Sequence, residues 1–139
     1  MNTKEFVKIL PNGNYQLLKD LSVPTDRIDK SLTVSCKWFY VQNGIIIIDE
    51  GFEWDGCTGS RDGKKDENGV AITWIASCVH DALCAAINSI KDFKVTQKTA
   101  DKILRDKLIE ANYKFLSILP PVFTGYMYYA GVRLFGRFF

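Results

Sequence analysis

The chain has 139 residues, of which 47% are hydrophobic and 24% are charged, and its net charge is +2. This length favours one domain, residues 1–139, that is large enough to bury a substantial core without disulfides. The small net charge argues against nucleic-acid binding, which usually needs a strongly basic surface.

Residues 1–54 are predicted to be mainly β-structure, because runs of β-type residues alternate with turn residues. A loop through Pro24 and Asp26 separates the early runs from the later ones. Asn43-Gly44 predicts a two-residue hairpin, because both residues accept positive φ. We therefore expect a small antiparallel sheet with hairpins, formed by the runs KEFVKIL, YQLL, LTVSCKWFYV and IIIIDE.

Residues 55–70 are rich in glycine and mixed charge, so they predict an exposed loop. Helical periodicity follows throughout residues 71–139, and Thr96 or Thr99 is placed to cap the second helix. The predicted fold class is α+β, with the N-terminal sheet packed on three C-terminal helices. The helices are expected at about 71–90, 96–113 and 120–137.

The first predicted helix contains His80, the only histidine of the chain. At about 100° per residue, its polar side chains fall within one narrow sector and apolar side chains cover the rest. Such a helix is buried, so the polar sector must face polar partners. The sector consists of Thr73, Ser77, His80, Asp81, Cys84 and Asn88.

Asp101 is the expected partner of His80, because it lies at the edge of the apolar face of the second helix. A carboxylate bonded to one ring nitrogen fixes the orientation of a histidine and leaves the other nitrogen free to take a proton from water. The predicted catalytic pair is therefore His80 as base and Asp101 as the residue that orients it.

Asp81 points about 100° away from His80 on the same helix, towards the loop that precedes it. Asp55 and Gly56 open that loop, and carboxylates with loop carbonyls are typical calcium ligands. We therefore expect Asp81, Asp55 and Gly56 to bind Ca²⁺ if the protein is a metal-dependent hydrolase.

Three alternatives remain open for the same residues. A zinc site would use His80 and Cys84 with Cys57 and Asp101, although no paired-cysteine spacing supports it. A cysteine nucleophile would have to use Cys84, which lies in an apolar helix. The third alternative is a buried polar network with no catalytic role, which fixes the packing of two helices.

Residues 113–139 are aromatic and basic, with no acidic side chain. Tyr126, Tyr129 and Arg133 share one helical face and are the expected interface residues. We favour a core or self-association helix over a membrane-surface or membrane-spanning one, because prolines and glycines interrupt the apolar run. The first residues do not form a signal peptide, so we expect a cytoplasmic protein.

Four motifs resemble, in the same order, a phage and prophage family known as domain of unknown function 1353. They are IIIIDEGFEWDGCT, WIASCVHDALC, TADKILRDKL and YMYYAGVRLFG. The resemblance covers residues 45–136 and implies a phage or prophage protein that acts in the virion or during infection. Its partners would then be other phage proteins or copies of itself, and Cys84 stands where the family has tyrosine. The matching residues are Gly51, Phe52, Asp55, Gly56, His80, Asp81, Leu83, Ala100, Asp101, Val132, Arg133 and Gly136.

The His-Asp helix is also similar, in its geometry, to that of secreted phospholipase A2. This resemblance implies that His80 activates water, Asp81 binds calcium and Asp101 orients the histidine. The loop oxygens between Asp55 and Gly59 would lie near the metal. A non-catalytic tail or head accessory protein remains the alternative.

Overall fold

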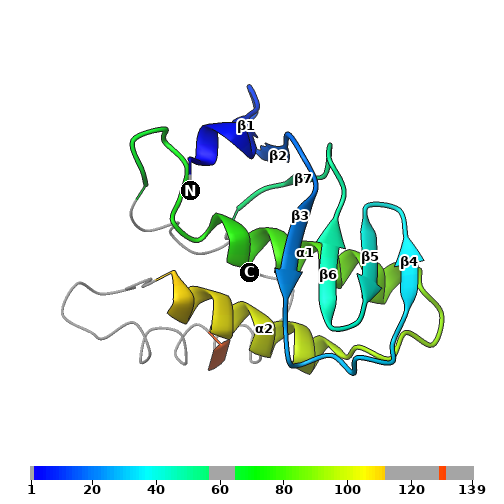
Figure 1. Cartoon of the computed structure of the whole chain (residues 1–139). Coiled ribbons are helices and arrows are strands. Elements are labelled where there is room, and N and C mark those ends of the chain that lie inside the picture. Colours follow the sequence, from blue (N-terminus) through cyan, green and yellow to red (C-terminus); the bar gives the residue numbers. More distant parts are fainter. Residues whose placement is uncertain (1, 57–64, 112–128, 131–139) are drawn as a thin grey trace.

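The computed structural model describes residues 2–56, 65–111 and 129–130 (Figure 1). Its described part contains two antiparallel sheets and two α-helices, which confirms the predicted α+β class. Sequence patterns predicted one small sheet, whereas the strands divide into a three-stranded and a four-stranded sheet.

The three-stranded sheet has the order β1-β2-β7. A short 3-10 helix, η1 (Thr3–Glu5), leads into β1 (Val7–Ile9), which pairs with β2 (Tyr15–Leu17). The third strand, β7 (Glu53–Trp54), comes from the end of the β-rich half and pairs with β2. Since Asp55 directly follows β7, this pairing fixes where the loop towards the helices begins.

The four-stranded sheet has the order β3-β6-β5-β4. The predicted hairpin between β5 and β6 is confirmed, since Asn43 and Gly44 both have positive φ, 52° and 74°. The strands are β3 (Leu21–Pro24), β4 (Val34–Cys36), β5 (Phe39–Gln42) and β6 (Ile45–Ile48).

Two predictions within this sheet were wrong. A loop was predicted through Pro24, but the residues up to and including Pro24 form strand β3. Pro24 is tolerated there because it is the last residue of an edge strand. The run LTVSCKWFYV is not one strand, because the chain turns between β4 and β5 at Trp38, whose φ is 73°. Positive φ is rare for a bulky side chain, so sequence patterns give little warning of this turn.

The helices α1 (Trp74–Ser89) and α2 (Gln97–Glu110) lie within the first two predicted helical ranges. Thr96 caps α2, since its hydroxyl accepts a hydrogen bond from the Thr99 amide. The third predicted helix, 120–137, lies outside the described residues apart from 129–130, which are helical. No helix in the described ranges combines the length and the apolarity needed to cross a bilayer.

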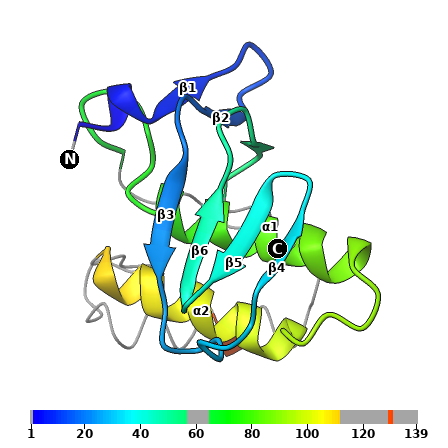
Figure 2. The same cartoon turned by 45° about the vertical axis from the view of Figure 1, so that its right-hand side comes forward.

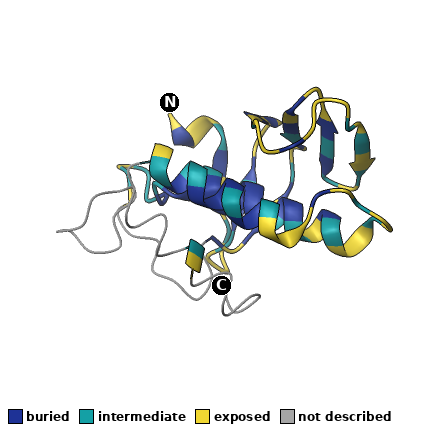
Figure 3. Ribbon diagram, turned by 90° about the horizontal axis from the view of Figure 1, so that it is seen from below, coloured by how far each residue is buried: buried dark blue, intermediate teal, exposed yellow. Residues whose placement is uncertain are grey.

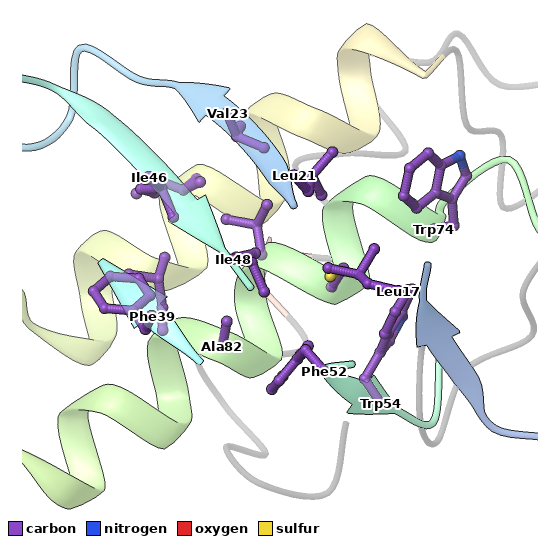
Figure 4. Packing of buried hydrophobic residues seen from close by; sticks show 14 of the residues in the cluster. Leu17, Leu21, Val23, Phe39, Ile46, Ile48, Phe52, Trp54, Trp74 and Ala82 are labelled. Carbon is purple, nitrogen blue, oxygen red and sulfur yellow. The ribbon is translucent and has the colours of Figure 1, made fainter. Parts of the chain in front are cut away.

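Helix α1 lies behind the four-stranded sheet, and α2 runs beside α1 (Figures 1 and 2). Most of α1 is buried. Along the described ribbon, exposed positions gather towards the helix ends and the turns (Figure 3). Leu17, Ile48 and Ala82 belong to one core shared by both sheets and α1 (Figure 4). This burial is why the polar side chains of α1 need partners.

Candidate functional site

The polar sector of α1 meets three different neighbours. Ser77 is 3% exposed and its hydroxyl accepts a hydrogen bond of 2.9 Å from Nε1 of Trp54 in β7. His80 faces α2, and Asp81 faces Asp55 at the end of β7. The sector is therefore divided between a structural contact and two charged junctions.

His80 and Asp101 form the contact that the sequence predicts. Nε2 of His80 lies 2.8 Å from Oδ1 of Asp101, and the two residues are only 6% and 1% exposed. Asp101 lies there because it belongs, with Ala100, to the buried face of α2. The contact joins α1 to α2 through a hydrogen bond that is shielded from solvent.

The charge of His80 depends on two opposing influences. Burial disfavours the imidazolium, but the hydrogen bond to Asp101 and the contact with Cys84 outweigh it and raise the pKa of His80 to about 10. At neutral pH the pair is therefore an imidazolium that donates its Nε2 hydrogen to a carboxylate. A base role for His80 requires this proton balance to change.

Gln97 completes the pair, although the sequence analysis did not select it. Its Nε2 donates to Oδ1 of Asp101 at 3.0 Å and lies 3.3 Å from Sγ of Cys84. Because the Asp101 carboxylate only accepts hydrogen bonds, the nitrogen of the Gln97 amide must face it. The spacing of four residues between Gln97 and Asp101 on one helix was the signal that could have found it.

Cys84 lies against the ring of His80. Its Sγ is 3.9 Å from Nδ1 and 3.7 Å from Nε2, so the sulfur contacts both ring nitrogens. At these long distances neither contact is a strong hydrogen bond, which weakens the cysteine-nucleophile alternative. Nδ1 is the ring nitrogen that Asp101 leaves free.

Asp81 meets Asp55, as predicted from the helical geometry. Burial of Asp81, opposed by the charge of His80 and reinforced by the charge and hydrogen bond of Asp55, raises the pKa of Asp81 to about 7. Below that pH Asp81 therefore carries a proton beside the carboxyl group of Asp55. Gly56, the third predicted metal ligand, is buried with a φ of 78°.

The metal predictions are only partly covered by the described residues. Within these, no group of three or more His, Cys, Asp or Glu side chains could hold a metal ion. Cys57, which the zinc alternative needs, lies outside the described residues, as does the rest of the loop to residue 64.

Of the predicted interface residues, Tyr126 and Arg133 lie outside the described residues. Tyr129 is half-buried, and its ring centre lies 5.0 Å from Cζ of Arg105 on α2. Arg105 is 8% exposed, so the contact is a cation–π interaction at a buried position. Part of the Tyr129 ring therefore packs within the chain itself.

These contacts provide a buried His–Asp pair whose second ring nitrogen, Nδ1, lies 3.9 Å from the Cys84 sulfur. Beside it, Asp81 lies next to Asp55 and is negatively charged at alkaline pH. The first arrangement is typical of acid–base catalysis, and the second is typical of proton or cation binding. No family model, no curated protein and no solved structure matches the chain.

Proposed function

We propose that the protein is a small phage or prophage protein, of the family that it resembles, in which His80 and Asp101 form a hydrolytic site. The observation that carries this proposal is the hydrogen bond of 2.8 Å between Nε2 of His80 and the buried Asp101 carboxylate. It supports a fixed imidazole whose Nδ1 is left to exchange a proton with water.

In this reaction a water oxygen attacks the carbonyl carbon of an ester while Nδ1 of His80 takes the water proton. The same nitrogen then gives that proton to the departing alkoxide, and the C–O bond of the ester breaks. Asp101 stabilises the imidazolium throughout. Because only the neutral ring can accept a proton, the rate should rise with pH towards the pKa of His80, about 10.

The carboxyl pair of Asp81 and Asp55 fits a hard dication, because such a cation can replace the proton of Asp81 at alkaline pH. Ca²⁺ typically takes six to eight oxygen ligands, and the two carboxyl groups with a Gly56 backbone oxygen would supply about half of them. When bound, the cation would supply positive charge for a developing oxyanion. At neutral pH and above, the described carboxylates supply the negative charge that such a cation needs.

A thermal-shift titration with Ca²⁺ and with Zn²⁺ tests the cation site. At about pH 8, where Asp81 is ionised, Ca²⁺ should raise the melting temperature of the wild type. At a hundredfold excess over Kd, the bound cation adds about 2.7 kcal/mol to the free energy of unfolding. Asp81→Asn should lose this response, whereas Asp26→Asn, on the exposed β3–β4 loop, should keep it. No response in the wild type would remove the calcium site, and an unchanged response in Asp81→Asn would place the cation elsewhere.

Hydrolysis is tested with nitrophenyl esters and with phospholipid vesicles. Loss of a general base costs about 10²–10⁴ in rate, so His80→Gln should lose nearly all activity while remaining folded. Lys91→Gln, an exposed change beyond the end of α1, is the control and should retain it. A folded His80→Gln protein with undiminished activity, or a wild type inactive on both substrate classes, would refute the hydrolytic site.

The second candidate is a non-catalytic phage accessory protein in which His80 and Asp101 only join two helices. The low exposure of His80, 6%, favours it. Two surface pockets, of about 480 and 550 Å³, lie beside the β3–β4 loop, and neither is lined by His80. In this role His80→Gln would lower stability but leave phage production intact.

Partners and location belong to the same proposal. The aromatic segment 113–139, with Tyr126, Tyr129 and Arg133, is proposed to bind other phage proteins or a second copy of the chain in the host cytoplasm or the virion. Size-exclusion chromatography with light scattering of the wild type and of Tyr126→Ala tests self-association. A monomeric wild type at high concentration would exclude the second copy.

A further inference from the structure

One oxygen of the Asp101 carboxylate takes part in two hydrogen bonds. Nε2 of His80 lies 2.8 Å from Oδ1 of Asp101, and Nε2 of Gln97 donates to the same oxygen at 3.0 Å. A carboxylate oxygen has two lone pairs, so it can accept both donors at once. Because both donors direct positive charge at the same oxygen, each of them weakens the bond that the other makes.

The two donors differ in their exposure to solvent. His80 and Asp101 are buried, whereas Gln97 is exposed. Gln97 is the first residue of α2, and a spacing of four residues on the helix places its side chain beside that of Asp101. The Gln97 amide therefore reaches from the surface to a carboxylate that is shielded from solvent.

Cys84 on α1 contacts both polar atoms of the same amide. Its sulfur lies 3.3 Å from Nε2 and 3.7 Å from Oε1 of Gln97. These contacts come from the opposite helix, so they keep the amide at the junction of α1 and α2. Gln97 is thus placed by two neighbours, the Asp101 carboxylate on its own helix and the Cys84 sulfur on α1.

Gln97 differs from the other groups around His80 because it does not titrate. His80 interacts electrostatically with Asp101 on α2, and with Cys84 and Asp81 on its own helix. The hydrogen bond to Asp101 and the contact with Cys84 favour the imidazolium. A second donor to Asp101 opposes this preference, because it stabilises the carboxylate without a proton on the ring.

We infer that Gln97 is a positioning residue for the His80–Asp101 pair, because its amide shares Oδ1 of Asp101 with His80 and weakens the bond between imidazolium and carboxylate. A weaker bond favours the neutral ring, which is the form that takes a proton from water. The effect on the rate rests on the proposed hydrolytic function, whereas the effect on the hydrogen bond does not.

Gln97→Met tests this role, because it removes the amide and keeps the length of the side chain. At about pH 7 His80 is an imidazolium, and a stronger hydrogen bond moves its Nε2 signal to higher chemical shift in nuclear magnetic resonance. The signal, detected through the carbon-bound ring protons, should therefore lie higher in Gln97→Met than in the wild type. Gln42→Met, the same chemical change on exposed β5, is the control and should leave it in place. An unmoved or lower signal in Gln97→Met would overturn the proposal.

The pH profile of ester hydrolysis separates this role from a merely structural one. Gln97→Met should lower the rate about threefold at about pH 8, because less of His80 is neutral, and the deficit should shrink as pH rises towards 10. A deficit of the same size at every pH would overturn the role of Gln97. An inactive wild type would refute the hydrolytic site, and the resonance signal of His80 would still decide whether Gln97 weakens the bond.

Discussion

His80 and Asp81 are neighbours in sequence, but they lie at two junctions with opposite electrostatics. His80 pairs with a carboxylate of α2, so its charge is compensated inside the fold. Asp81 is buried beside Asp55, so burial and a second negative charge oppose its ionised form more than the charge of His80 favours it. The difference arises because successive residues of an α-helix point about 100° apart and meet different parts of the molecule.

The two junctions therefore suit different roles. A compensated pair in a buried position holds two helices together and changes little with ligands. At the Asp81 junction ionisation is opposed, so a proton or a cation stabilises it. The three predictions below test whether the charge of His80 stabilises the fold and the charge of Asp81 destabilises it.

The largest effect is expected from Asp101→Asn, which keeps the shape but removes the counter-charge of His80. Removing one partner of a buried ion pair costs about 3 kcal/mol or more in the free energy of unfolding. Asp106→Asn, on the same helix, breaks the more exposed pair with Arg27 at 2.8 Å and is the control. That change should cost less than about 1 kcal/mol.

Urea unfolding at neutral pH measures both variants. If Asp101→Asn cost no more than Asp106→Asn, the His80 junction would not be the main polar contact between α1 and α2.

The second prediction concerns the pH dependence that His80 gives to stability. Its pKa is raised in the fold from 6.5 to about 10, so the stabilisation is complete below 6.5 and is lost as pH rises towards 10. Between about pH 7 and pH 9 the wild type should lose up to about 1.4 kcal/mol per pH unit, and His80→Gln should lack this slope.

His80 is the only histidine of the chain, so its ring signals in a nuclear magnetic resonance titration are unambiguous. They should still report an imidazolium at about pH 8. A midpoint below about pH 7 would mean that Asp101 does not stabilise the protonated ring of His80, and the first prediction would lose its basis.

Much of this site follows from local rules that operate on sequence alone. The hairpin at Asn43-Gly44 depends on the positive φ that both residues accept. The contacts of His80 with Asp101 and of Asp81 with Asp55 depend on the fixed angular spacing of a helix and on the need of buried polar groups for partners. Such rules need no knowledge of the rest of the fold.

Other features could not be predicted because they depend on distant segments. Strand β7 has only two residues, too few for a hydrophobic period, and pairing with β2 defines it. Strand β3 ends in Pro24, which favours a loop in sequence analysis, and pairing with β6 defines it. Gln97 looks like an ordinary exposed residue at the start of a helix. Its role appears only when α2 lies against α1 and brings it to Cys84.

The third prediction concerns the Asp81 junction, in the absence of divalent cations. The pKa of Asp81 is raised from 3.8 to about 7, so its stabilising contribution is complete below 3.8 and is lost as pH rises to 7. Asp81→Asn resembles the protonated form at every pH. It should therefore be close to the wild type in stability near pH 4 and be more stable by up to about 4 kcal/mol at pH 8.

Denaturant unfolding at both pH values measures this difference, and Asp26→Asn should show no such gain. The direction is what separates the two junctions, because neutralising Asp101 removes a needed charge whereas neutralising Asp81 removes an opposed one. A loss of stability in Asp81→Asn at pH 8 would show that the Asp81 charge is compensated within the fold, and the contrast between the two neighbours would then be lost.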